Sequence, residues 1–126
     1  MIVCVAIDCL GICKIPALSI IGEFDLKKEA ALTIAMTGRA LDFEALSLIG
    51  ERVLNLERLL NLRFGANAAD DTLPDIFSEE PVNRGPCNRK KVVGLASRVK
   101  SFYRIMGWDD NGVPTDEKLK LLELSS

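Results

Sequence analysis

Histidine is absent from this chain of 126 residues. This excludes a catalytic triad that uses histidine as the general base, and it excludes zinc sites that depend on histidine ligands. Aromatic residues are also scarce at 6%, with one tryptophan and one tyrosine. Any chemistry in the chain must therefore rest on carboxylates, thiols, basic side chains or a cofactor.

The four cysteines, at positions 4, 9, 13 and 87, include no C-x-x-C pair. Neither a zinc ribbon nor a thioredoxin-like motif is supported. The apolar start of the chain lacks the basic residues of a secretory leader, and Asp8 and Lys14 make it too short and too polar to span a membrane. We therefore expect reduced thiols in a cytoplasmic protein that is not bound to a membrane.

The charge is nearly balanced, with a formal net value of −2. This gives no overall signature of nucleic-acid binding, and we expect no nucleic-acid partner. The stretch 84–104 nevertheless holds seven basic residues, and no Asp or Glu lies between Pro81 and Trp108. Such a stretch could meet a phosphate-bearing cofactor or an acidic partner, but a solvated helix face is the simpler interpretation.

Length and composition, with 48% hydrophobic and 27% charged residues, are typical of one globular domain over residues 1–126. The patterns predict an all-α, multihelical fold without convincing strands. The predicted segments are helices over 2–12, 26–37, 42–64, 90–106 and about 115–124, and an irregular loop over about 65–89.

Several residues are predicted to define the ends of these helices. Asp25, Asp42 and Thr115 are candidate N-caps, and Gly38 and Gly65 are natural stops.

Apolar spacing predicts which faces of the helices are buried. The expected apolar sets are Ala30, Ala31, Ile34 and Ala35 in the second helix, and Leu46, Ile49, Val53, Leu56 and Leu60 in the third.

The first helix is apolar on almost every side, which predicts burial. Because such a helix stands at the start of the chain, we expect that the chain is a piece of a larger protein. Without its natural cover, the stretch 2–12 would favour self-association.

The segment 8–13, Asp-Cys-Leu-Gly-Ile-Cys, carries the strongest chemical signal. It places a carboxylate and a thiol on either side of a glycine that lets the backbone turn. A charge inside an apolar run is costly without a partner, so Asp8 should have a dedicated one. The segment predicts that Asp8 and Cys13 hold two groups side by side.

The order of motifs resembles the C-terminal domain of the tungsten-containing aldehyde ferredoxin oxidoreductases. That family carries Asp-x-x-Gly-Leu-Cys, Thr-Gly, Gly-Glu-Arg-x-x-Asn-Leu-Glu-Arg, Arg-x-Gly and Asp-Asp-x-Leu-Pro. The corresponding stretches here are residues 8–13, 37–38, 50–58, 63–65 and 70–74. The family closes on a Tyr-Tyr, Arg-Gly-Trp-Asp and Gly-x-Pro-Thr series, which resembles residues 102–103, 106–109 and 112–115.

The resemblance implies roles for three residues. Asp8 would hydrogen-bond the pterin of a tungstopterin cofactor, and Ile12 would contact that pterin through its backbone. Cys13 would be one of four thiolate ligands of a [4Fe–4S] cluster, which suits the soft thiolate ligand that iron prefers. The resemblance assigns no role to Cys4 or Cys9, and a buried helix cysteine is the default for each.

The chain departs from the family at Ile12, Ala69 and Met106, and it carries only one of the four cluster ligands. The resemblance therefore implies a cofactor-supporting part of an enzyme that oxidises an aldehyde to a carboxylate and passes electrons to ferredoxin. Its implied partners are the N-terminal domains of that enzyme. The chain alone is expected to be inactive and to hold no cofactor. The alternative is a freestanding helical interaction module without a cofactor.

Overall fold

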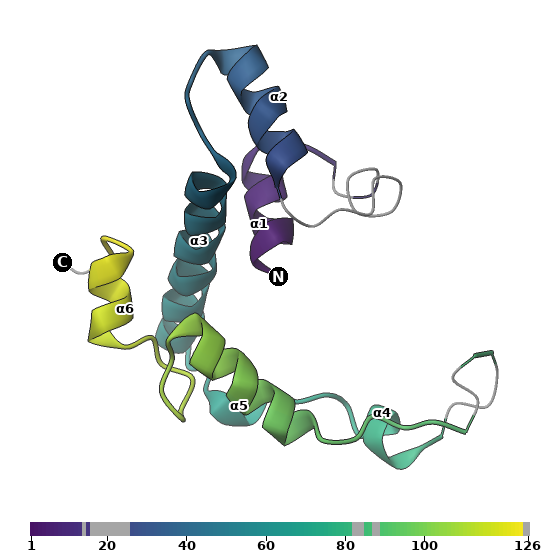
Figure 1. The fold of residues 1–126 in the computed structure, drawn as a ribbon. Coiled ribbons are helices and arrows are strands. Elements are labelled where there is room, and N and C mark those ends of the chain that lie inside the picture. Colours follow the sequence, from purple (N-terminus) through teal and green to yellow (C-terminus); the bar gives the residue numbers. More distant parts are fainter. Residues whose placement is uncertain (14, 16–25, 82–84, 87–88, 125–126) are drawn as a thin grey trace.

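A computed structural model describes residues 1–13, 15, 26–81, 85–86 and 89–124. Within these residues the regular elements are helices (Figure 1). They are α1 (Ile2–Cys9), α2 (Lys27–Thr37), α3 (Phe43–Arg63), η2 (Ala68–Asp70), α4 (Ile76–Glu79), α5 (Leu95–Met106) and α6 (Asp116–Leu121). An isolated bridge between Trp108 and Pro114 is the nearest approach to a sheet in this part of the chain. The predicted all-α fold is confirmed.

The long helix α3 organises the molecule (Figure 1). Helices α1 and α2 pack beside its first half, and α5 and α6 lie toward its other end. The main cluster of buried apolar residues is at the first half and consists of Ala6, Ile7, Leu26, Ala30 and Leu46. In the apolar start of the chain, Ala6 and Ile7 are thus buried, and residues 2–5 are half-buried.

The contact between α1 and α3 depends on Gly50. A Cβ at this position would lie 2.6 Å from the backbone oxygen of Ile2 and 3.3 Å from the Cβ of Ala6. Because the first neighbour is backbone, a larger residue could be accommodated only by moving α1. A glycine inside a helix costs stability through its freedom when unfolded, and here it allows the two helices to approach closely.

We expect that Gly50→Ala lowers the free energy of unfolding by roughly 1–2 kcal/mol, because the overpacking at Ile2 exceeds the gain in helix propensity. Chemical denaturation of the chain measures it. Ser47→Ala, one turn earlier on the same helix, is the control and should change stability by less than about 0.5 kcal/mol. A stabilised Gly50→Ala variant would show that α1 does not pack closely at this point.

The ends of α3 follow the sequence, but its buried face does not. The predicted N-cap is confirmed, because the Asp42 carboxylate accepts a hydrogen bond from the Ala45 N–H at 2.8 Å. The predicted apolar stripe is wrong at Leu56 and Leu60, which are 48% and 53% exposed. The buried residues of α3 are Leu46, Gly50, Leu54, Asn55 and Arg58. The polar residues Asn55 and Arg58 are tolerated on the buried face because the side chain of each has a hydrogen-bond partner there.

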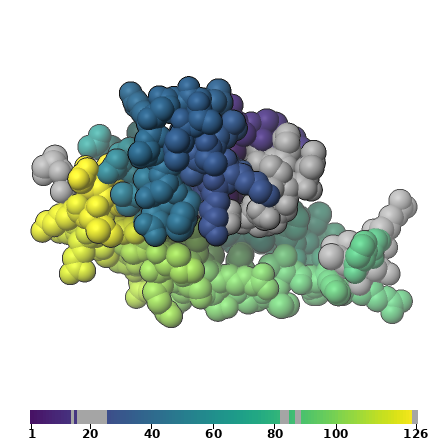
Figure 2. All heavy atoms as spheres, turned by 45° about the horizontal axis from the view of Figure 1, so that its top comes forward, coloured from purple at the N-terminus to yellow at the C-terminus, as the bar shows by residue number. Residues whose placement is uncertain are grey.

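Helix α2 also buries a different face from the one predicted. Of the expected apolar set only Ala30 is buried, and Ile34 is 44% exposed. The buried face includes Glu29 and Thr33, whose hydroxyl donates to the Glu29 carbonyl at 2.8 Å. Figure 2 shows the region of α2 as blue spheres at the top and front of the molecule. Gly38 ends α2 as predicted, with φ at +69°. Asp25, predicted as its N-cap, lies outside the described residues.

The C-terminal part of the chain joins α3 through polar contacts. Arg52 donates to the Leu122 carbonyl at 2.8 Å, and Lys118 pairs with Glu51 at 2.6 Å. Thr115 caps α6 as predicted by accepting from the Lys118 N–H. These contacts place α6 against the flank of α3 (Figure 1).

Helix α5 begins five residues later than predicted, after Gly94, and its buried residues are Tyr103 and Met106. Within the region predicted as an irregular loop over 65–89, the described residues include the short elements η2 and α4. None of the helices in the described residues is long and apolar enough to cross a membrane.

Candidate functional site

The end of α1 is a Schellman turn, which explains the spacing of the segment 8–13. The N–H of Gly11 donates to the Asp8 carbonyl at 3.0 Å, and the N–H of Ile12 donates to the Ile7 carbonyl at 3.3 Å. These are the two hydrogen bonds of that motif, with Gly11 at φ +69° in the left-handed region. A Cβ at Gly11 would meet open space, so backbone conformation alone calls for glycine here.

This turn separates one half-buried residue from two exposed ones. Ile12, directly after the glycine, packs against the cluster of Ala6, Ile7 and Leu46. Such an apolar contact after the glycine commonly accompanies the motif. Asp8 and Cys13 are exposed. The apolar composition of the segment predicted burial, but in this chain Asp8 and Cys13 lie at the surface, and the buried residues of α1 are Ala6 and Ile7.

The cysteines of the described part are free thiols. Cys9 and Cys13 are exposed, and Cys4 is half-buried. The default of a buried cysteine is thus wrong for Cys9. Among the described residues, no group of three or more Cys, Asp or Glu side chains could hold a metal ion. Cys87 lies outside them.

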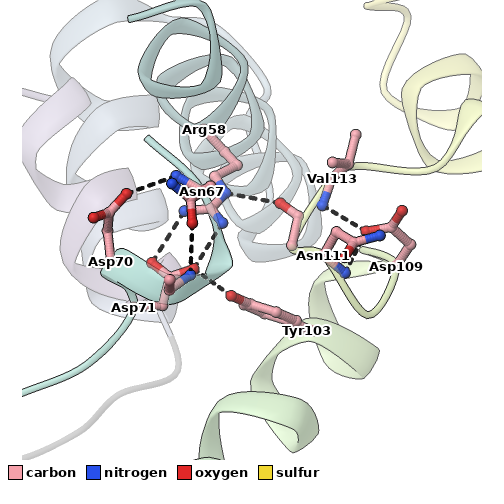
Figure 3. A network of polar contacts seen from close by, with 10 residues as sticks. Arg58, Asn67, Asp70, Asp71, Tyr103, Asp109, Asn111 and Val113 are labelled. Carbon is pink, nitrogen blue, oxygen red and sulfur yellow. Dashed lines mark hydrogen bonds and ion pairs between the residues drawn. The ribbon is translucent and has the colours of Figure 1, made fainter. Parts of the chain in front are cut away.

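A second polar centre lies where α3, η2 and α5 meet (Figure 3). The Arg58 guanidinium donates to both carboxylate oxygens of Asp71, at 3.0 and 2.6 Å. The Tyr103 hydroxyl donates to the same carboxylate. The Arg58 side chain is only 7% exposed and that of Asp71 is 29% exposed. A two-pronged pair of this kind fixes geometry as well as charge.

The same arginine holds the turn that follows α5. Its Nε donates to the Gly112 carbonyl at 2.7 Å, and its guanidinium carbon lies 5.0 Å from the centre of the Trp108 ring. The Trp108 indole N–H donates to the Asn55 side chain at 2.8 Å. A Cβ at Gly112 would lie 2.8 Å from the Tyr103 ring, so this turn needs glycine. Arg58 therefore joins three segments that are distant in sequence.

The neighbouring carboxylates of Asp70 and Asp71 have different hydrogen-bond partners. Asp70 accepts from the Asn67 N–H at 2.8 Å and completes a capping box at the start of η2. Asp71 holds Arg58.

This network shifts two titrations. Burial raises the pKa of Asp71, but hydrogen bonds from Tyr103 and Arg58 and the positive charge of Arg58 outweigh it, so the pKa lies below its ordinary value of 3.8. Burial, together with the hydrogen bond to Asp71 and the charge of Asp71, raises the pKa of Tyr103 above 10.0. The stabilisation from Asp71 is thus present above pH 3.8 and is lost as the pH falls through the folded-state pKa.

We expect that the folded chain loses stability as the pH rises above 10.0, because the unfolded chain releases the Tyr103 proton first. The chain has one tyrosine, so its ultraviolet titration reports this residue alone. The folded chain should titrate at a higher pH than the denatured chain. Asp71→Asn is the matched variant and should lower the folded-state pKa of Tyr103. Identical titration of folded and denatured chains would contradict the contact.

The comparison with known families decides the assignment. The model of "Aldehyde ferredoxin oxidoreductase, domains 2 & 3" matches residues 2–124. The chain belongs to the aldehyde ferredoxin oxidoreductase family. The resemblance seen in the motifs is therefore confirmed.

The curated relatives of this family member are much longer. The tungsten-containing aldehyde ferredoxin oxidoreductase of Pyrococcus horikoshii is 46% identical over 77 residues, which cover 60% of this chain and 12% of the relative. The Pyrococcus furiosus enzyme of the same description is 44% identical over 78 residues, which cover 61% of this chain and 13% of the relative. The aliphatic sulfonate oxidoreductase, WOR-like subunit, of P. furiosus is 33% identical over 84 residues, which cover 61% of this chain and 13% of the relative.

A solved structure shares this helical arrangement. It is the active-site complex BamBC of benzoyl coenzyme A reductase in complex with 1,5-dienoyl-CoA. The TM-score is 0.61 at 26% identity, and the match covers 79% of this chain and 14% of that chain. The match thus extends over most of this aldehyde ferredoxin oxidoreductase family member and a small part of a larger protein.

The structure brings together the later family motifs, for which the resemblance implied no individual roles. Arg58 and Asn55 belong to the third motif, Asp71 to the fifth, and Tyr103 and Trp108 to the closing series, and all five meet in one network. The sequence contained these residues as separate motifs. Their contacts with one another could not be predicted from motif spacing, because they join residues up to 54 positions apart.

Proposed function

We propose that this chain supports the cofactors of a tungstopterin aldehyde:ferredoxin oxidoreductase. In this proposal Asp8 hydrogen-bonds the pterin, the backbone of Ile12 contacts it, and Cys13 binds a [4Fe–4S] cluster. The observation that carries the proposal is the Schellman turn, which leaves Asp8 and Cys13 exposed while it anchors Ile12. A short, anchored turn suits ligands that must be held in fixed positions.

The donor set of this turn fits one corner of such a site. Cys13 is a free, exposed thiol, the ligand type that iron–sulfur clusters require. Asp8 offers a carboxylate, an acceptor for the N–H groups of a pterin. The cluster needs three further thiolates, and these would come from the preceding domains of the enzyme. When bound, the tungsten centre would supply the two-electron oxidation of an aldehyde and the cluster an exit for electrons toward ferredoxin.

Within this proposal the residues of the chain bind and position, and none of them serves as the acid or base of the reaction. The relatives at 46% and 44% identity are named for aldehydes and tungsten, whereas the relative named for aliphatic sulfonates is more distant at 33%. Aldehyde oxidation to a carboxylate is therefore the favoured reaction of the full enzyme. Membership in this family speaks against a freestanding interaction module without cofactor.

We expect that Asp8→Ala in the full-length enzyme keeps the iron and weakens the pterin. Hydrogen bonds to a charged acceptor contribute roughly 1.5–3 kcal/mol, so cofactor affinity should fall by about one to two orders of magnitude. Tungsten and pterin content after dialysis measures the loss. Cys9→Ala, one residue away and also exposed, is the control and should retain both. Full retention of tungsten in Asp8→Ala would contradict the role of Asp8.

A further inference from the structure

Helix α1 rests on one turn of α3 near both of its ends. At the start of α1, a Cβ at Gly50 would lie 2.6 Å from the Ile2 carbonyl oxygen, so the two backbones approach closely there. At the other end, Ile7 shares a buried cluster with Leu46, and Ile12 packs against this cluster after the Schellman turn. Leu46 and Gly50 are four residues apart, about one helical turn. A single turn of α3 therefore holds both ends of α1.

The segment 8–13, called the cofactor turn below, is attached firmly to α1. The N–H groups of Gly11 and Ile12 donate to carbonyls in the last turn of the helix. A helix of eight residues such as α1 is about 12 Å long, and its internal hydrogen bonds make it move as one body. A change in the position of Ile2 is therefore transmitted to Asp8 and Cys13 at the other end.

Gly50 accepts no side chain without a movement of α1. Its nearest neighbour is the backbone oxygen of Ile2, which cannot turn away as the end of a flexible side chain can. One added methyl group would therefore displace the start of α1 by several tenths of an ångström. The groups of a binding site have to be held within about 0.5 Å of their productive positions. Such a displacement is small for the fold but large for ligands held by residues 8–13.

We propose that Gly50 is a positioning residue for the cofactor turn. It acts through α1, because it sets the depth at which this helix lies on α3 and thus the place where Asp8 and Cys13 are held. This inference rests on the proposed function for the groups that are bound, whereas the coupling between Gly50 and the turn does not depend on it. Gly50 opens the third family motif, so this motif serves the turn through its glycine and the Arg58 network through its later residues.

The first experiment uses the chain alone and requires no cofactor. Gly50→Ala should shift the amide NMR resonances of residues 11–13, because the turn moves with α1. Ile49→Val is a milder change at the same contact and should shift the same resonances less, which keeps the test valid if Gly50→Ala does not fold. Tyr103→Phe is the control. It also lowers stability by removing the hydrogen bond to Asp71, but it lies outside the cluster that holds α1 and should leave these resonances unchanged.

The second experiment measures tungsten and pterin content of the full-length enzyme after dialysis. Gly50→Ala should lower the affinity for the pterin cofactor about tenfold, the scale typical of changes just behind the direct ligands of a metal. Tyr103→Phe should retain both at the wild-type level. A loss in Gly50→Ala alone would show that position, and not stability, determines retention.

Two results would overturn the positioning role. One is unchanged resonances of residues 11–13 in both Gly50→Ala and Ile49→Val, and the other is shifted resonances with wild-type retention of tungsten and pterin in Gly50→Ala. If Cys13→Ala keeps its iron and Asp8→Ala its tungsten, the proposed function itself fails. Shifted resonances in the chain alone would then show that the contact at Gly50 is not the cause of that failure.

Discussion

Replacing Arg58 with alanine is expected to lower the free energy of unfolding by about 3 kcal/mol. Removing one partner of a buried ion pair costs roughly 3–5 kcal/mol, because the other charge is left without compensation. The lower end applies here, since the Asp71 side chain is still 29% exposed. The change also leaves the Gly112 carbonyl without its donor and removes the guanidinium from the Trp108 ring.

Denaturation of the chain, followed by tryptophan fluorescence, measures this loss at the affected ring itself. Arg63→Ala is the matched control, because Arg63 is exposed near the end of the same helix. It should change stability by no more than about 0.5 kcal/mol. Equal stabilities of the two variants would show that the Arg58 network does not hold α5 and the turn at Gly112 against α3.

Replacing Cys13 with alanine in the full-length enzyme is expected to abolish the iron–sulfur cluster and, with it, electron transfer. Thiolate ligation is direct, and the chain has no histidine that could take the place of the lost ligand. Because Cys13 is exposed, the same change should leave the stability of this chain almost unaltered. The loss of the cluster would then report ligation and not unfolding.

The sequence predicted features that local chemistry determines. Asp42 caps α3 because a carboxylate before an apolar run satisfies a free N–H, and this rule needs no knowledge of distant residues. Gly38 ends α2 for a similarly local reason. The glycine in the segment 8–13 was correctly interpreted as a turn.

The faces of the helices were less predictable, because they depend on which helix packs where. Spacing alone favoured Leu56 and Leu60 as buried, yet the buried face of α3 is occupied by Asn55 and Arg58. These polar residues are tolerated inside because Trp108, Asp71 and Gly112 supply their partners from other segments. Exposed leucines on α3 are consistent with a chain that corresponds to a small part of its relatives.

The motif in segment 8–13 indicated the candidate site, but the sequence did not predict which of its side chains are exposed. The apolar composition predicted burial of this segment, whereas in this chain Asp8 and Cys13 are exposed and Ile12 is half-buried against the core cluster. An apolar composition cannot distinguish a helix packed on all sides from one packed on a single side. The roles of Asp8, Ile12 and Cys13 toward the cofactors stay predictions.

Iron content of the full-length enzyme, measured in parallel for Cys13→Ala and Cys9→Ala, tests the central claim most directly. Both thiols are free and exposed and lie four residues apart. The two variants therefore remove the same group, one before and one after the Schellman turn. The proposal predicts that Cys13→Ala loses the iron of the cluster and that Cys9→Ala keeps it. Loss of iron in Cys9→Ala with retention in Cys13→Ala would contradict the assignment of the whole segment.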